Sequence, residues 1–594
     1  MNPGDFSRSY YRSSACIKNV CRALRLLLLS CFALALIACS ATHDALSSQA
    51  LKPADTIFIG KHIVSVDEDL PNPEAVAVRG EKIIAVGSAK AIMKQRGVKT
   101  RVVQLGSKAL VPGFIDAHGH LGLYSRFIDF ANLSSPPVGP VRSIDDMRAV
   151  LAAHIKQRTI EPGNWVMGYG YDDSLLQEKR HPTRYDLDKI STEHPIVLMH
   201  VSGHLVAVNS KALALSNVSA TTENPPGGVI RRFAGGTEPN GVVEEVAIYP
   251  FVIEQLGEVA PDKLNALVSK ALDVYASYGI TTVQDGAASL TDINVMRANA
   301  ANKEYPLDIV AYPVGTMLGE QGVADLGVSQ QYRGGFRVGG IKLMLDGSPQ
   351  GRTAFLSRPY KEGPPGAAAD YRAYPSMPAE TFNPIVEKLL DTGVPTIVHA
   401  NGDAAIEMMI DGVAAAINAE NMPDHRSVII HAQLMREDQL HRVKALGLMP
   451  SYYAVHPFFW GDWHRKSFGD ERASFISPLA RTTELGIPFT IHNDTPVVPP
   501  DMIRLMWIAV NRETRSGYVL GPDQRVGAEH ALHAITQAAA YQYFEEQYKG
   551  SITLGKQADL VILSSNPVAV APDEIKSIQV VETFARGRSV YQRP

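Results

Sequence analysis

Short apolar runs alternate with longer amphipathic segments through the middle of the chain. Segments 380–390, 404–419 and 502–510 have the apolar spacing of helices and lie next to such runs. The eight runs that we expect to be strands are 109–115, 279–284, 306–314, 340–345, 394–398, 427–430, 449–455 and 488–491. Repeated strand–helix units predict parallel strands, and eight units predict an α/β fold, a closed (β/α)8 TIM barrel with its active site at the carboxyl ends of the strands.

The two ends of the chain follow a different pattern, with short β-rich runs broken by glycine and proline. Such runs occur at 55–60, 75–78 and 82–87, and again at 550–552, 559–563 and 580–584. We expect 54–108 and 546–594 to form one small β-sandwich and 109–545 to form the barrel. Segment 121–260 is too long for a crossover, so it is predicted to be an insertion after barrel strand 1, folded over the barrel mouth.

The N-terminus looks like a targeting segment. Basic residues from Arg8 to Arg25 precede an apolar run, 26–38, that has signal-peptide length and is too short to span a bilayer comfortably. The run ends in Leu36-Ile37-Ala38-Cys39, which resembles a bacterial lipobox. We therefore expect a signal peptide at 1–38, a lipid on Cys39 and a tether at 39–53; an ordinary signal peptide with a chance cysteine is the alternative. Ser40 then predicts the periplasmic side of the outer membrane in a bacterial cell envelope.

Cysteine and charge content narrow the chemistry. The cysteines are Cys16, Cys21, Cys31 and Cys39, so the folded body has none. This excludes disulfides, a cysteine nucleophile and cysteine zinc ligands there, and leaves histidine and carboxylate as metal ligands.

A net charge of −4 provides no basic surface for nucleic acid. We expect a small-molecule substrate and a membrane contact through the lipid as partners, and leave a homodimer open.

A pair of histidines closes the first predicted strand. Residues i and i+2 of a strand point to the same side, so His118 and His120 can both face the barrel axis. Two neutral imidazoles on one rigid edge suit zinc or a similar ion. The bare His-x-His pattern fits a chance surface pair equally well.

The residues before this pair carry a family resemblance. Pro112-Gly113-Phe114-Ile115-Asp116-Ala117 resembles the strand-one signature of the metal-dependent amidohydrolase superfamily. The type 3 branch is the most similar, and its other landmarks here are 203–204, 208–210, 347–348, 352–354 and 555–560. The resemblance implies a metal-dependent hydrolase that cleaves amide-like C–N bonds of N-acyl, formamide or cyclic amide type in a small substrate.

Other strand ends supply further candidate ligands. Lys342 stands alone in an apolar strand, so it must be paired, neutral or chemically changed; a salt bridge with Asp346 is one possibility. The resemblance implies instead a carboxylated Lys342 that bridges two ions, a bridge that a one-ion site does not need. It further implies that the metal ligands are His118, His120, Lys342, His399, His431 and Asp494.

The resemblance also implies catalytic roles. Asp494 would accept the proton of the attacking water, and His204 or His456 would stabilise the oxyanion. The candidate substrate-binding residues are Tyr171, Asp172, His204, Arg352, His456, Trp460 and His492. Before the strand-eight acid, His492-Asn493 stands where many relatives have Gly-Ser. Because this pair lies beside the site, the substrates of those relatives cannot be assigned to this protein. A mononuclear deaminase, an ester or lactone hydrolase and a non-catalytic ligand-binding lipoprotein are the alternatives.

Overall fold

The computed structural model describes residues 52–70, 72–173, 175–201, 203, 205–225, 228–256, 259–315, 326–364, 367–417 and 424–594. The predicted signal peptide, the lipidation site Cys39, most of the tether and His204 therefore lie outside the described residues. Within the described ranges, no helix combines the length and apolar character needed to cross a membrane.

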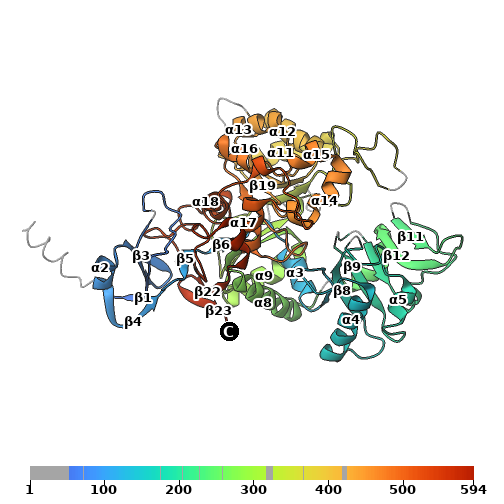
Figure 1. Cartoon of the computed structure of the whole chain (residues 1–594), viewed down its shortest axis with the longest axis horizontal. Helices are drawn as coiled ribbons and strands as arrows, with labels where there is room; N and C mark the ends of the chain where they lie inside the picture. The colour runs from blue at the N-terminus through green and yellow to red at the C-terminus, as the bar shows by residue number, and fades with distance from the viewer. Residues whose placement is uncertain are drawn as a thin grey trace, which may run out of the picture.

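Parallel strands form the centre of the molecule (Figure 1). One sheet contains β6 (Phe114–Ile115), β13 (Ile280–Ala288), β14 (Asp308–Pro313) and β15 (Phe336–Val338). The other contains β16 (Ile341–Met344), β17 (Thr396–Ala400), β18 (Val428–His431), β19 (Met449–Tyr452) and β20 (Thr490–Ile491). Val314 bridges to Lys342 on one side. On the other side, the His120 N–H donates to the Thr495 carbonyl at 2.8 Å. These contacts link the sheets on both sides, giving a TIM-barrel-like α/β core.

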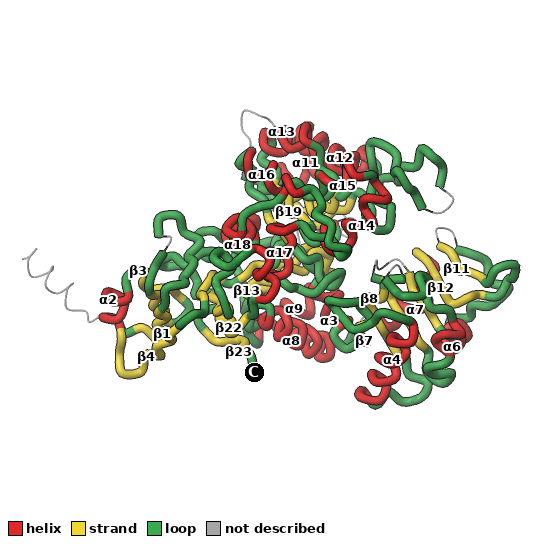
Figure 2. Tube along the Cα trace, in the orientation of Figure 1, coloured by secondary structure: helices red, strands yellow, loops and turns green. Residues whose placement is uncertain are grey.

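The helices lie outside these strands, as the red segments around the yellow core in Figure 2 show. Helix α12 illustrates the packing, because its side chains at Ile406, Met409, Ile410 and Val413 are buried while the opposite face is not. The larger helices around the core are α8 (Pro261–Ser277), α9 (Leu290–Asn302), α11 (Ala379–Asp391), α12 (Asp403–Ala416), α13 (Glu437–Ala445), α14 (His456–Phe468) and α17 (Met502–Asn511). Shorter helices are α15 (Asp470–Ser474), α16 (Leu479–Glu484), α18 (Ala528–Ala534) and α19 (Gln537–Gln542).

Each predicted barrel strand overlaps an observed strand, but the first is divided. At Gly113 the chain leaves β5 (Ala109–Pro112), which pairs with β21, and enters β6 of the barrel. A Cβ on Gly113 would lie 2.5 Å from Thr281 Oγ1, so glycine permits this close crossing. The predicted boundary at 109 is therefore wrong, and the barrel begins after Gly113. Strand four also begins earlier than predicted, at β15.

Two four-stranded sheets join the ends of the chain. One contains β1 (Ala54–Ile59), β2 (Ala75–Arg79), β3 (Lys82–Gly87) and β4 (Arg96–Gln104). The other contains β5, β21 (Leu560–Leu563), β22 (Val580–Ala585) and β23 (Arg588–Gln592). Phe58 and Phe584 meet edge to face at 5.1 Å within one hydrophobic cluster that spans both sheets. The predicted strand at 550–552 is wrong, since these residues form no strand.

The segment after β6 contains a sheet of its own. Its strands are β7 (Ala131–Asn132), β8 (Val166–Tyr171), β9 (Ile196–His200), β10 (Leu205–Val208), β11 (Gly228–Arg232) and β12 (Pro239–Glu245). Its helices are α3 (Leu121–Phe127), α4 (Ile144–Arg158), α5 (Arg184–Asp188), α6 (Ser210–Leu215) and α7 (Tyr249–Leu256). This region lies beside the barrel in Figure 1. It contacts the barrel loops where Arg515 donates to the Pro136 carbonyl at 2.9 Å.

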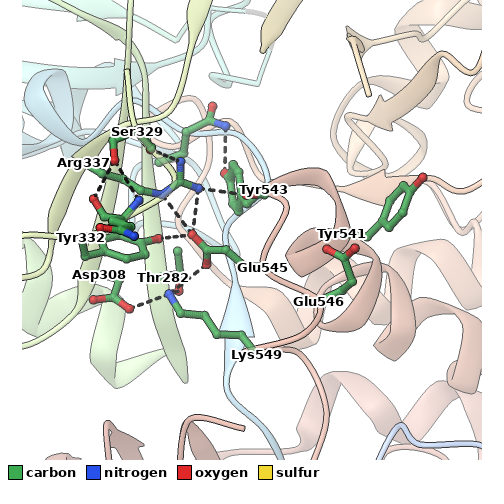
Figure 3. A network of polar contacts seen from close by, with 12 residues as sticks. Thr282, Asp308, Ser329, Tyr332, Arg337, Tyr541, Tyr543, Glu545, Glu546 and Lys549 are labelled. Carbon is green, nitrogen blue, oxygen red and sulfur yellow. Dashed lines mark hydrogen bonds and ion pairs between the residues drawn. The ribbon is translucent and has the colours of Figure 1, made fainter. Parts of the chain in front are cut away.

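A buried charge network closes the amino ends of the barrel strands (Figure 3). Lys549 Nζ lies 2.5 Å from Asp308 Oδ2 and 3.0 Å from Glu545 Oε2. Arg337 Nη2 lies 2.8 Å from Glu545 Oε1. Burial alone would lower the pKa of Lys549, but Asp308 and Glu545 hold it well above its ordinary value. We call these four side chains, Asp308, Arg337, Glu545 and Lys549, the floor network.

Candidate metal centre

His118 is held in a defined tautomer at the end of barrel strand one. Gln284 donates its amide N–H to the Ala117 carbonyl and to Tyr543 Oη, which leaves Gln284 Oε1 as the acceptor for His118 Nδ1 at 2.6 Å. Burial keeps the pKa of His118 well below its ordinary value, so the ring is neutral. The lone pair of Nε2 therefore points into the barrel mouth.

Asp494 and His431 meet this lone pair. Asp494 Oδ1 lies 3.5 Å from His118 Nε2 and 3.1 Å from His120 Nε2. Ligand atoms of His118, His431 and Asp494 lie within 4.8 Å of one another. Two acceptors, an imidazole lone pair and a carboxylate, thus face each other across a space that suits a cation. Burial acts to raise the pKa of Asp494, but His120 and nearby positive charge lower it to about 2.

The backbone at both residues is strained. His431 has φ 72° and Asp494 has φ 55°, in the left-handed region that disfavours side chains with a Cβ. Strain of this kind costs on the order of 1–3 kcal/mol and is found where a site demands it. The strand ends are thus bent to aim these two side chains into the mouth.

Lys342 belongs to the same cluster. Its Nζ lies 3.1 Å from His118 Nε2, and the side chain is almost completely buried. Burial lowers the pKa of Lys342 to about 7, against the opposing effect of Asp494. Among the interactions of the described residues, no ion pair joins Lys342 to Asp346. Asp346 instead accepts backbone N–H groups of Phe355, Asn401 and Gly402.

His399 lies against His431 on the neighbouring strand. The two rings are joined by a 3.0 Å contact between His431 Nε2 and His399 Nδ1. His399 Nε2 contacts the Gly347 carbonyl at 3.2 Å and Asn401 Nδ2 at 3.1 Å. Burial lowers the pKa of His399 to about 4, so this ring is also neutral and can act as a ligand.

A wall of further aromatic rings continues from the centre. The His492 ring is 5.1 Å from those of His118 and His431, and it stacks on Tyr453 at 5.4 Å. His456, the first residue of α14, lies 4.4 Å from Tyr453. Both histidines are buried, and burial lowers the pKa of His492 to about 3. The structure therefore places His492 next to the metal candidates and His456 one ring further away, beyond Tyr453.

The remaining predicted substrate contacts have structural partners. Tyr171 is fully buried and lies 3.2 Å from His181 Nδ1. Arg352 donates to Ser467, Gly363 and Glu362, and its guanidinium covers the Trp463 ring at 4.3 Å. Asp172 and Trp460 line a small hollow between the insertion and the barrel loops. Of these four, only Asp172 and Trp460 are lining residues of this hollow.

Gln284 and Tyr453 were not found from the sequence. Gln284 fixes the His118 tautomer, and Tyr453 separates His492 from His456. Their positions in the predicted strands could have indicated them, because Gln284 ends predicted strand two and Tyr453 lies in predicted strand seven. Strand ends at the same rim meet in space even where the residue type suggests no chemistry.

Imidazoles, a carboxylate and a buried amine gathered at the carboxyl ends of barrel strands define a metal-dependent hydrolase. The chain belongs to the amidohydrolase family, whose model Amidohydro_3 matches residues 101–591. It is therefore an enzyme that hydrolyses carbon–nitrogen bonds with a divalent metal, as the sequence predicted.

Known relatives are similar over nearly their whole length. An N-substituted formamide deformylase of Arthrobacter pascens is 27% identical, covering 91% of this chain and 98% of the relative. The putative amidohydrolase YtcJ of Bacillus subtilis is 25% identical, covering 90% and 99%. The solved structure of an uncharacterized metal-dependent hydrolase from Pyrococcus furiosus has a TM-score of 0.68 at 24% identity, covering 86% and 99%. This last match shows a shared fold.

Proposed function

We propose that the enzyme hydrolyses the C–N bond of a small N-substituted formamide, or of a related N-acyl or cyclic amide, with one or two zinc ions. The observation that carries the proposal is the convergence of His118, His431 and Asp494 next to the buried amine of Lys342. The name of the Arthrobacter relative supports a formamide as the first substrate to test.

The proposed ligands are His118, His120, His399, His431, Asp494 and a carboxylated Lys342. The facing lone pair of His118 and carboxylate of Asp494, 3.5 Å apart, fit a bound cation. A divalent ion held there would supply a water of lowered pKa and would polarise the scissile carbonyl.

Asp494 is proposed to move the proton. Its depressed pKa keeps the carboxylate ionised at neutral pH, so Oδ1 can accept a proton from the attacking water. The water oxygen bonds to the carbonyl carbon, the C–N bond breaks, and Asp494 returns the proton to the leaving nitrogen. His456, or His204 outside the described residues, is proposed to donate to the oxyanion.

Purified enzyme is expected to release formate or acid from N-substituted formamides or N-acyl amino acids. We expect kcat/KM for this class to exceed that for aryl esters and cyclic amidines by at least about 100-fold. This ratio corresponds to about 2.7 kcal/mol in transition-state free energy. Removing metal with dipicolinate should abolish turnover, and Zn²⁺ should restore it. Faster hydrolysis of aryl esters, or deamination of a cyclic amidine, would favour the alternative enzymes.

We also propose that Cys39 anchors the enzyme to the periplasmic side of the outer membrane through a lipid. Cys39→Ser is expected to move the enzyme from the membrane fraction to the soluble fraction without changing kcat. Fractionation after a high-salt wash measures this, with Cys31→Ser as the matched control in the same leader. A Cys39→Ser protein that still pellets with membranes contradicts the anchor.

A further inference from the structure

A second group of metal-ligand side chains lies in the insertion sheet. Strands β8 and β9 are parallel neighbours, and Tyr171 pairs with His200 where both strands end. Asp172 and Asp173 follow Tyr171 directly, so both carboxylates leave the sheet beside His200. One ligand atom each from Asp172, Asp173 and His200 lie within 4.8 Å of one another.

His181 completes this group from the following loop. Its Nε2 lies 3.7 Å from Asp173 Oδ2, and its Nδ1 lies 3.2 Å from the hydroxyl of buried Tyr171. When Nδ1–H donates to the Tyr171 oxygen, the lone pair of Nε2 faces the carboxylate. Ligating histidines in proteins have this form, with one ring nitrogen fixed by a neighbour and the other free for the ion.

The contacts of Asp173 with the two histidines differ in length. His200 Nε2 contacts Asp173 Oδ1 at 3.1 Å, an ordinary hydrogen bond. The 3.7 Å between His181 Nε2 and Asp173 Oδ2 is longer than a hydrogen bond. Two ligands each about 2.1 Å from a tetrahedral ion are about 3.4 Å apart, which is close to this spacing.

We propose that Asp173, His181 and His200, with Asp172 beside them, form a divalent-cation site separate from the barrel centre. Two imidazoles and carboxylates favour Zn²⁺ or a similar transition ion over Mg²⁺ or Ca²⁺. The Asp173 side chain is 31% exposed, so an ion can enter from solvent.

The site would tie the insertion to the barrel mouth. Asp172 and Val201, on either side of the site, line the small hollow shared with Trp460 and Val497. An ion that joins the segment after β8 to the end of β9 would fix both residues against α14 and the loop that follows barrel strand eight. The site therefore positions part of the wall of the mouth and takes no part in the bond cleavage.

Cobalt titration of the metal-stripped full-length enzyme tests this site. Wild type is expected to bind one Co²⁺ equivalent more than His181→Gln or Asp173→Asn, which keep the size of the side chain. The control His154→Gln, on α4 of the same insertion, should bind as many ions as wild type. The His118→Ala variant should lose the ions of the barrel centre and keep the Co²⁺ ion bound in the insertion. The insertion site can therefore be tested even if the proposed function is wrong.

Equal Co²⁺ counts in wild type, His181→Gln and Asp173→Asn would overturn the site. Thermal unfolding of each variant in EDTA shows whether its apo fold is intact, and Asp173→Asn alone decides the matter if His181→Gln fails to fold. Anomalous diffraction at the cobalt edge is expected to place the additional ion between Asp173 and His181.

Discussion

Replacing Lys342 by alanine is expected to lower kcat by more than about 100-fold, beyond the loss typical of a residue that only supports a ligand, while the fold survives. Lys342 is almost completely buried 3.1 Å from His118 Nε2, and its lowered pKa makes the neutral amine accessible near neutral pH. A neutral amine can attack CO₂, forming an N–C bond and releasing a proton. The resulting carbamate anion suits a site between two dications, where an ammonium would be repelled.

Chemical rescue distinguishes this bridge from a simple packing role. Acetate or propionate is expected to restore part of the activity of Lys342→Ala by replacing the lost anion. Lys342→Arg should show no rescue, because its fixed positive charge occupies the bridge position. Metal stoichiometry and crystallographic density are the measurements, since acid removes a carbamate. An unmodified ammonium paired with Asp346, with one ion per active chain, would contradict the bridge and favour a mononuclear enzyme.

Replacing Lys549 by methionine is expected to lower the free energy of unfolding by about 3–5 kcal/mol, the range seen when one partner of a buried ion pair is removed. Lys549 Nζ pairs with Asp308 and Glu545, and all three side chains are at most 4% exposed. Without the ammonium, Asp308 and Glu545 each lose a cationic partner, and the remaining pairs with Arg586 and Arg337 lie in a region that solvates charge poorly. Denaturant unfolding of the mature enzyme measures the loss.

Lys270 provides the matched control for this prediction. It forms an ion pair with Asp129 at 3.1 Å, but its side chain is 53% exposed. Lys270→Met should therefore cost at most about 1 kcal/mol, as expected of a surface pair. Losses of similar size in Lys549→Met and Lys270→Met would show that the floor network adds no special stability.

The rim of the barrel could be predicted because its chemistry follows the strand pattern. His118, Lys342, His399 and His431 each lie in or at the end of an apolar run, and parallel strands bring such positions to one rim. The sequence left open whether Lys342 pairs with Asp346 or is carboxylated. Asp346 accepts backbone N–H groups and the amine of Lys342 lies beside His118, which speaks against the ion pair, while carboxylation stays a prediction.

The floor network could not be predicted, because its partners are far apart in the chain. Lys549 and Asp308 are separated by 241 positions, and no local pattern links them. The division of the first strand at Gly113 was missed for another reason. A buried apolar run looks the same in a barrel as in a terminal sheet, so its pattern does not reveal where the chain changes partners.

The position of the last strands has a consequence for how the chain matures during synthesis. Arg337 pairs with Glu545, 208 positions later, and β5 pairs with β21, about 450 residues later. At about 5–20 residues/s a ribosome takes roughly 20–90 s to cover that distance. The floor network and the sheet that contains β5 therefore stay incomplete until translation is nearly finished. A chain that completes its fold this late can still pass through a translocation channel in an unfolded state. The signal peptide predicted at 1–38 would require such a passage.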